Sequence, residues 1–147
     1  MRVVLDTNVF IDSAKDEHSA GARLLDDLKE GKVTAVASSA VTREYNKIIT
    51  RLIQTSQDKE RVQDALQEVQ PVDPKPTTIQ IDDEEDRKFI EAALGGDATA
   101  IITSDRHLLD IGEIAGVRMM RPEELINTLE EETSSAWQEI VKGLGIK

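Results

Sequence analysis

The sequence predicts an α/β fold, a three-layer α/β/α sandwich with a mostly parallel central sheet. Two observations predict it. Short runs of β-branched and aliphatic residues alternate with longer segments whose apolar residues follow helical spacing. Such alternation is typical of a parallel sheet covered by helices on both faces. The second observation is the length of 147 residues, which suits one hydrophobic core rather than two.

The first half of the chain supplies two predicted strands and three predicted helices. Residues 2–5 and 33–37 are short β-branched runs, as buried strands require. Serine residues, which cap helices well, precede the first two helical segments, and Gly31 closes the first of them. The predicted helices are 20–29 after Ser19, one that begins at Ser38 or Ser39, and 58–69.

Three prolines, at positions 71, 74 and 76, interrupt regular structure before the second half. The alternation then resumes. Gly95-Gly96 closes a predicted helix, and Pro122 suits the first position of another. The predicted elements are strands 77–81, 99–103 and 116–120, helices 83–94 and 106–109, and a last helix from residue 122 whose apolar stripe reaches Leu144.

Composition excludes several classes of site. The chain has no cysteine, which excludes disulfides, thiol catalysis and cysteine-bound zinc. We find no secretory signal and no apolar run near the roughly 20 residues that span a bilayer, so we expect a cytoplasmic protein without membrane contact. The net charge of −11 disfavours broad attraction to nucleic acid. A cation bound between carboxylates can, however, reverse the sign locally.

Four acidic residues fall at informative places relative to the predicted strands. Asp6 follows the first strand directly, and Asp105 follows strand 99–103. Glu44 and Asp86 lie about one turn into helices that follow other strands. Because open parallel sheets bind ligands at the carboxyl ends of their strands, we expect these acids to converge there.

Converging carboxylates repel one another. Two charges about 5 Å apart cost roughly 3 kcal/mol at an effective dielectric near 20. Protonation or a bound cation relieves that repulsion. An all-oxygen cluster suits Mg²⁺ or Mn²⁺, and such a metal can ionise a water and stabilise the charge on a phosphate. From the residues alone, helix capping by Asp6 and Asp105 and a solvated Glu44 stay open as alternatives.

Four segments resemble the motifs of the PIN-domain family. Residues 3–10 are an apolar strand followed by Asp-Thr-Asn, and residues 38–45 carry a Glu after a strand and a Ser-rich turn. Residues 86–93 place an Asp ahead of a Phe-aliphatic helix. Residues 100–109 give a strand, Thr, a small residue, Asp and a Leu-Leu pair. The order and spacing match, and the resemblance covers residue 2 to about residue 129.

The resemblance implies a PIN-like nuclease domain over residues 1–129, followed by a helical tail over residues 130–147. It implies an endoribonuclease that depends on Mg²⁺ or Mn²⁺. Two positions depart from the pattern, since Asp82 and Asp83 rival Asp86 and His107 stands where many members carry another acid. The residues implied for catalysis and metal binding are Asp6, Glu44, Asp86 and Asp105, with Asn8 and Thr103 or Ser104 as supporting groups.

The resemblance also bears on biological role and partners. Many stand-alone PIN domains of this size are toxins of type II toxin–antitoxin pairs, held by a small antitoxin-like partner. We favour that role because nothing here resembles an accessory RNA-binding domain. A housekeeping RNA-processing nuclease and a non-catalytic protein-binding PIN domain are the alternatives. The cations we expect to contact RNA are Arg43, Arg87, Lys88 and Arg106, from a wider basic set that includes Lys47 and Arg51.

Two further features test these readings. A haloacid-dehalogenase-type phosphatase would need a second Asp where Asn8 stands, and a receiver-type phospho-acceptor predicts neither Glu44 nor Asp86. The tail carries Trp137 and, at helical spacing, Ile140 and Leu144. An exposed apolar stripe invites association. We therefore expect the tail either to fold back on its own domain or to pack against an antitoxin-like partner or a second copy, as in a homodimer.

Overall fold

The computed structural model describes residues 1–145 and contains a six-stranded sheet in the order β3-β2-β1-β4-β6-β5. Neighbouring strands are parallel except for β5 and β6, which are antiparallel. The predicted α/β class with a mostly parallel sheet is confirmed. The strands are β1 (Arg2–Leu5), β2 (Thr34–Ala37), β3 (Gln70–Pro71), β4 (Ala100–Ile102), β5 (Glu113–Ile114) and β6 (Val117–Met120).

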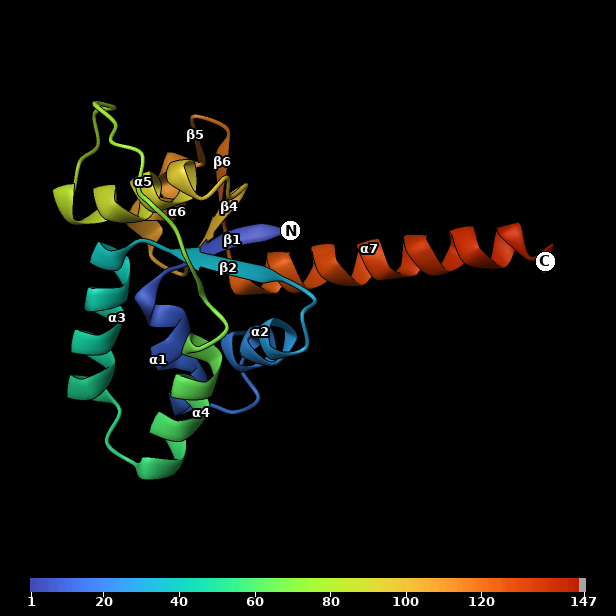
Figure 1. The fold of residues 1–147 in the computed structure, drawn as a ribbon, viewed down its shortest axis with the longest axis horizontal. Helices are drawn as coiled ribbons and strands as arrows, with labels where there is room; N and C mark the ends of the chain where they lie inside the picture. Colours follow the sequence, from blue (N-terminus) through green and yellow to red (C-terminus); the bar gives the residue numbers. More distant parts are fainter. Residues whose placement is uncertain (146–147) are drawn as a thin grey trace.

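Helices cover both faces of this sheet (Figure 1). On one face α5 crosses β1, β2, β4 and β6, while α1, α2 and α4 pack together on the other. The three-layer arrangement expected from the sequence is therefore present. The helices are α1 (Thr7–Lys15), α2 (Ala20–Lys29), α3 (Ser39–Leu52), α4 (Ser56–Leu66), the 3₁₀ turn η1 (Glu84–Asp86), α5 (Arg87–Gly95), α6 (Arg106–Ile111) and α7 (Pro122–Gly143).

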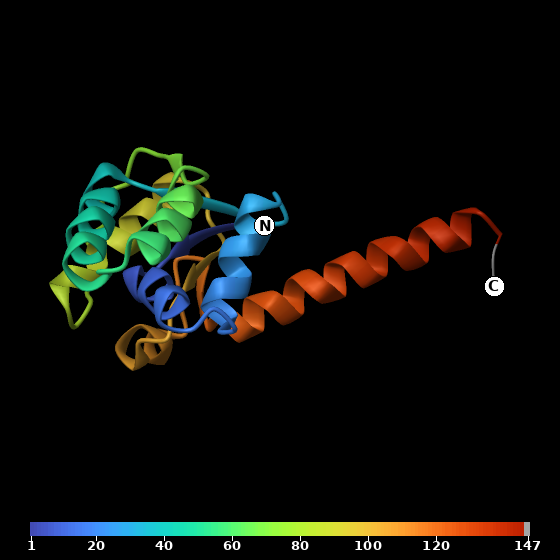
Figure 2. The same ribbon diagram turned by 90° about the horizontal axis from the view of Figure 1, so that it is seen from below.

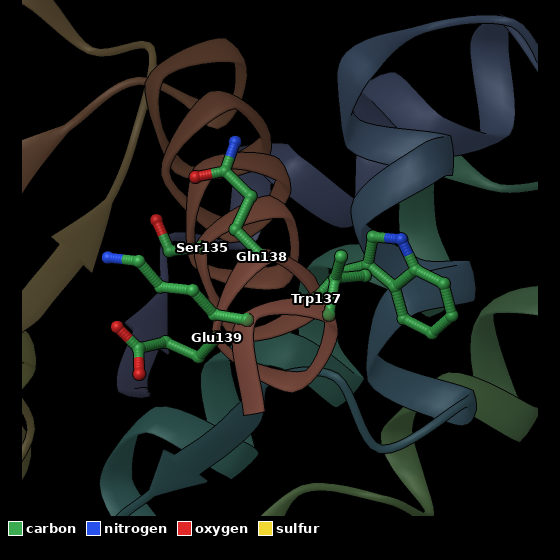
Figure 3. A pocket seen from close by; sticks show the side chains of 6 residues that line it. Ser135, Trp137, Gln138 and Glu139 are labelled. Carbon is green, nitrogen blue, oxygen red and sulfur yellow. The ribbon is translucent and has the colours of Figure 1, made fainter. Parts of the chain in front are cut away.

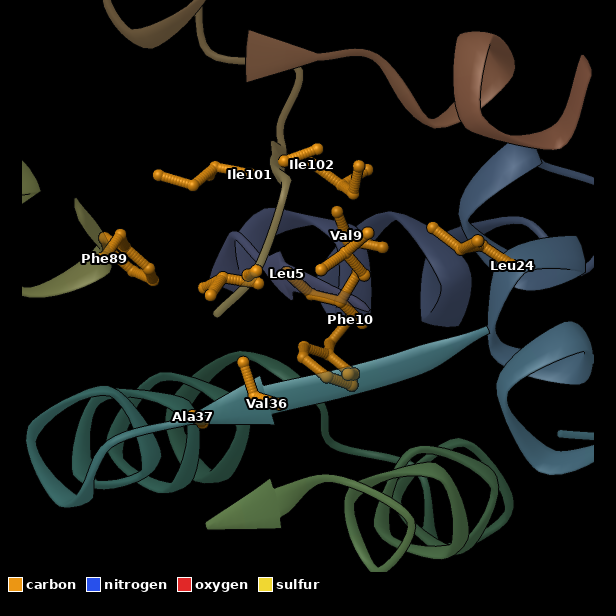
Figure 4. Packing of buried hydrophobic residues seen from close by; sticks show 14 of the residues in the cluster. Leu5, Val9, Phe10, Leu24, Val36, Ala37, Phe89, Ile101 and Ile102 are labelled. Carbon is orange, nitrogen blue, oxygen red and sulfur yellow. The ribbon is translucent and has the colours of Figure 1, made fainter. Parts of the chain in front are cut away.

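The core lies around β1, whose apolar residues are buried on both faces, as a central parallel strand requires. In Figure 4, Phe89 of α5 lies on one side of Leu5, and Val9 and Phe10 of α1 lie on the other. The ring of Phe10 meets that of Tyr45 edge to face, with centroids 4.8 Å apart. The Tyr45 hydroxyl donates to the carbonyl of Leu5. These contacts fix α3 against the end of β1.

The predicted strand over residues 77–81 is wrong. The third strand is instead β3, a two-residue edge strand beside β2, and residues 72–81 form no regular structure. Side chains of α5 bind the backbone of this segment: Glu91 accepts from the Thr77 N–H at 2.8 Å, and Arg87 donates to the Thr77 carbonyl at 2.7 Å. Because these groups are satisfied by α5 and prolines remove two further donors, the segment gains little from pairing as a strand.

Two other local features differ from the predictions. The predicted helix 83–94 is divided into η1 and α5, so that Asp86 lies at the junction. The hairpin of β5 and β6 was not predicted. Its two-residue turn has φ 51° at Ala115 and φ 84° at Gly116, a left-handed pair that suits tight hairpins. Gly95 is also required sterically, since a Cβ there would lie 1.9 Å from the Asp73 carbonyl oxygen.

Helix α7 is continuous but lies in two environments. Its first turns bury Leu125, Ile126 and Leu129 against the rest of the chain, where α7 contacts α2. Beyond them the helix leaves the body and projects outward (Figures 1 and 2). From residue 130 to 145 only Val141 is even partly shielded. The helix therefore does not fold back over its own domain. In the described part of the chain, no helix is both long and apolar enough to cross a membrane.

Candidate active site

The carboxyl ends of β1 and β4 bring two of the acids to one edge of the sheet. Asp6 follows β1, and its N–H donates to the carbonyl of Ile102, the last residue of β4, at 2.8 Å. Asp105 lies just beyond β4, at the N-terminus of α6. Parallel pairing of β1 with β4 thus joins residues that are far apart in the sequence.

Asp6 is a buried carboxylate, only 7% exposed. It stands at the N-terminus of α1, yet its side chain makes no capping hydrogen bond there. Instead it accepts from the hydroxyl of Thr103 at 2.8 Å, and Thr103 is itself fully buried. Burial raises the pKa of Asp6, the Thr103 hydrogen bond opposes this, and the charges of Asp105 and Glu44 raise it further. The burial that makes Asp6 costly to ionise thus argues against a simple capping role.

Asp105 is held in place from two directions. Its N–H donates to the Thr103 hydroxyl at 2.9 Å, and one of its carboxylate oxygens accepts from the N–H of His107 at 2.9 Å, which caps α6. Thr103 therefore links the two acids, whereas Ser104 is exposed. Asp105 therefore caps α6 and is also linked to Asp6 through Thr103.

Asp86 lies where η1 meets α5 and is partly exposed. Burial, together with the negative charges of Asp83, Asp105 and Asp6, raises the pKa of Asp86 to about 6. Its rivals differ in position: Asp82 and Asp83 are exposed, and Asp83 caps η1 by accepting from a backbone N–H at 3.0 Å. The charges of Asp6 and Asp105 thus both act on Asp86, which favours it as the third acid of the site.

Glu44 differs from the other acids because its charge has a partner inside the chain. One of its oxygens lies 2.7 Å from the ammonium of Lys88, and the other accepts from the hydroxyl of Thr7. Lys88 also contacts Glu85 at 3.0 Å. Burial disfavours the charged lysine, but hydrogen bonds to Glu44 and Glu85 raise its pKa overall. Sequence reasoning treated Glu44 as a metal ligand and Lys88 as an RNA contact, and the structure pairs them.

The remaining three acids, Asp6, Asp86 and Asp105, influence one another electrostatically. Over residues 1–145, no three His, Asp or Glu side chains are close enough together to form a ready-made metal site. The donor set nevertheless fits a hard cation, since it consists of carboxylate oxygens that repel one another in a half-buried place. A bound cation would relieve this repulsion.

The structure also positions the other residues singled out in the sequence. Asn8 is exposed on the first turn of α1, and Arg43 and Arg106 are exposed on α3 and α6. Arg87 is bound to Glu84 at 2.7 Å and to a carbonyl.

Sequence reasoning missed three contributors: Thr7, Tyr45 and the pairing of Lys88 with Glu44. Thr7 belongs to the Asp-Thr-Asn motif, which was the available signal for it. The Lys88–Glu44 pair joins helices that only the fold brings together, so no local pattern could reveal it.

A comparison with known families gives a clear result. A family model described as PIN domain matches residues 2–107, which include all four acids. The chain belongs to the PIN domain family. Members of this family are typically nucleases and generally bind divalent metals. The whole of α7 lies outside the matched residues.

Solved structures agree with this assignment at the level of the fold. A chain of VapBC2 from Rickettsia felis, crystallised with a DNA fragment from its promoter, superposes with a TM-score of 0.59. The two chains are 15% identical, and the match covers 82% of the present chain and 98% of the other. A search of curated proteins found no match.

Proposed function

We propose that this PIN domain is an endoribonuclease that uses Mg²⁺ or Mn²⁺ to hydrolyse RNA phosphodiester bonds. One observation carries the proposal: the buried Asp6, oriented by Thr103, shares its surroundings with Asp105 and Asp86, and none of these three acids has an ion-pair partner within residues 1–145. A buried carboxylate without a counter-charge is costly. A divalent cation would balance the buried negative charge, and the three acids would then form a metal site.

In this proposal Asp6, Asp86 and Asp105 hold the metal, which when bound supplies an ionised water and stabilises charge on the phosphate. Thr103 fixes the orientation of Asp6 through its hydroxyl. Glu44 keeps its pairing with Lys88 and so holds an ammonium group at the edge of the site, where a substrate phosphate can meet it. Asn8 and Ser104, both exposed beside these acids in the chain, are available as polar contacts to substrate.

For the biological role we propose a toxin of a type II toxin–antitoxin pair. Membership of the PIN domain family supports it, and the likeness to a VapBC2 chain is compatible with it, although at 15% identity that likeness concerns the fold. A housekeeping RNA-processing nuclease is the alternative. The identity of the adjacent reading frame separates them, since a short neighbouring gene with a DNA-binding fold is expected for a toxin. The acids argue against a non-catalytic binding module, because such a module has no need for a buried Asp6.

The partner we propose for the distal half of α7 is a second copy of this chain. Trp137, Ile140 and Leu144 are 66%, 54% and 69% exposed. Figure 3 shows Trp137 projecting from the helix on a different side from Glu139. An isolated stretch of about four helical turns is marginal in water, and a single line of large apolar side chains favours association.

The pattern of this stripe is self-complementary. The spacing of its large apolar residues is the same from either end of the stripe, with the centre between Ile140 and Val141. The four residues are Trp137, Ile140, Val141 and Leu144. An antiparallel pair about a two-fold axis would set Trp137 against the partner's Leu144 and Ile140 against the partner's Val141. The charged Glu139 and Lys142 lie on the opposite side of the helix at this spacing, away from the contact.

Metal binding and catalysis can be tested together. Mg²⁺ or Mn²⁺ should raise the melting temperature of the wild-type protein and permit cleavage of single-stranded RNA. Asp6→Asn should fold, lose the metal-dependent stabilisation, and lower cleavage by at least about 100-fold, more than the loss of a supporting hydrogen bond typically costs. Asp83→Asn, which removes an exposed neighbouring charge, is the matched control and should retain most activity. Wild-type levels of cleavage by Asp6→Asn would refute the proposed site.

A further inference from the structure

The cations near the acids fall into two sets. Arg87 and Lys88 are engaged by Glu84, Glu44 and Glu85 in close ion pairs. A second set makes no side-chain ion pair or hydrogen bond within residues 1–145, and its members on α3 are exposed to solvent. These members are Arg43, Lys47 and Arg51, which we call the α3 basic stripe.

The α3 basic stripe has a regular geometry. Its residues are spaced by four positions, so they lie along one side of the helix at intervals of about 6 Å. The only acid on α3 is Glu44, and its charge is balanced by Lys88. On a chain with a net charge of −11, a run of three cations without an acidic counterpart on the same helix is a local reversal of sign. Such a reversal favours a polyanionic partner.

The stripe begins beside the Glu44–Lys88 ion pair, at the edge of the candidate active site. A groove of about 360 Å³ runs beside α3 and is lined by Arg43 and Lys47 on one side and by Glu85 and Lys88 on the other. Glu44 also lines this groove, where its carboxylate is paired with Lys88. From there α3 runs away from the edge of the sheet toward α4, carrying the stripe with it (Figure 1).

We propose that single-stranded RNA leaves the acids through this groove and follows α3, with successive phosphates against Arg43, Lys47 and Arg51. This inference rests on the proposed nuclease function and adds the path of the substrate. Phe10, Tyr45 and Phe89 are buried, so no aromatic ring near the stripe is available to stack on bases. Recognition along α3 therefore acts on the backbone of the RNA, tolerates any sequence and weakens with salt.

The test uses the triple variant Arg43→Gln/Lys47→Gln/Arg51→Gln and a labelled single-stranded RNA, with binding measured across a salt series in the absence of divalent metal. Loss of three phosphate contacts should reduce the slope of log affinity against log salt by about 2. With metal present, the KM for RNA should rise much more than the KM for bis(p-nitrophenyl) phosphate, which is too short to reach along α3. The RNA kcat should change least.

The matched control is Lys15→Gln/Lys29→Gln/Arg118→Gln, which removes three exposed cations elsewhere and should keep the wild-type salt slope. A wild-type slope in the α3 variant, with RNA cleavage intact, would overturn the path and leave the nuclease proposal standing. Failure of the wild-type protein to cleave either substrate, with a reduced slope in the α3 variant, would overturn the nuclease and retain the RNA surface. A wild-type protein that binds no RNA would overturn both.

Discussion

The region where Asp6, Asp86 and Asp105 act on one another, which we call the acidic crevice, and the distal half of α7 are incomplete in opposite ways. In the crevice, Asp6 is buried beside other negative charges without a cation among the described side chains. On distal α7, Trp137 and Leu144 are apolar and exposed, without a surface to cover them. One region lacks positive charge and the other lacks apolar contact.

The contrast identifies what each region needs. A buried charge is stabilised by an opposite charge, and an exposed apolar stripe is stabilised by another apolar surface. Elsewhere in the body, the buried apolar residues pack into one continuous cluster. Substitutions that change charge should therefore alter metal binding and stability through the crevice. Substitutions that remove apolar area should destabilise the fold in the first turns of α7 and affect only association in its distal half.

The largest effect should come from comparing the two halves of α7 directly. Leu125 is fully buried, so Leu125→Ala should lower the free energy of unfolding by about 2–5 kcal/mol. Trp137→Ala removes a larger side chain, yet at concentrations where the protein is monomeric it should change that free energy by less than about 0.5 kcal/mol. Chemical denaturation at low protein concentration measures both. Equal costs at the two positions would show that the distal half packs against its own domain.

A second experiment sharpens the charge side of the comparison. Lys88→Met removes the internal counter-charge of Glu44, so the crevice becomes more negative. At an effective dielectric near 20, two unit charges about 8 Å apart interact by roughly 2 kcal/mol, and a divalent ion by about twice that. Screening reduces this effect, so Mg²⁺ or Mn²⁺ should bind at least about tenfold more tightly. Calorimetry measures the change. Lys47→Met, an exposed lysine on the same groove, is the control, and an equal gain there would mean that the ion pair has no special role.

The pH dependence of stability gives a smaller effect, which comes from the protonation of Asp86 in the crevice. Because the pKa of Asp86 is raised to about 6 from an ordinary value near 3.8, the native state holds this proton more readily than the unfolded chain. The resulting stabilisation is complete below about pH 4 and is lost as the pH rises through 6. The loss should be about 1 kcal/mol in metal-free protein, since Asp86 is partly exposed and screened.

The control for this prediction is Asp86→Asn. The difference between the wild-type and variant unfolding free energies should change between pH 4 and 7 and be flat above pH 7. Mg²⁺ or Mn²⁺ should stabilise the wild type more at pH 7 than at pH 5, because the metal competes with the proton. A difference that does not vary with pH would mean that Asp86 has an ordinary pKa.

How far the sequence predicted the structure also differs between regions. The strand β1, with the Asp6 that follows it, could be predicted because a buried parallel strand is apolar along its whole length. The segment 77–81 could not, because the backbone N–H and carbonyl of its first residue, Thr77, are bound by Glu91 and Arg87 of a later helix. The pairing of Glu44 with Lys88 likewise depends on how α3 and α5 meet. Local patterns predict elements, whereas contacts between distant elements decide the charge balance of the site.

The smallest effect on stability, and the most direct test of the apolar side, should come from removing residues 130–147. The retained part of α7 keeps its buried residues Leu125, Ile126 and Leu129, so the melting temperature of the monomer should hardly change. The loss concerns association. Two distal helices bury an area near the lower limit for a stable interface, roughly 1,000 Å² in total, so we expect a weak dimer that dissociates on dilution.

Sedimentation of the full chain over a concentration series, beside the truncated chain and Trp137→Ala, measures this directly. The full chain should dimerise, both variants should remain monomeric, and Ser135→Ala, on the charged side of the helix, should behave as the full chain does. A truncated chain that still dimerises would place the contact on the body. A full chain that stays monomeric at high concentration would mean that the stripe serves a different protein, and the proposed second copy would be wrong. Since the crevice lies in the body, metal-dependent stabilisation should survive the truncation, which keeps the two incomplete regions experimentally separate.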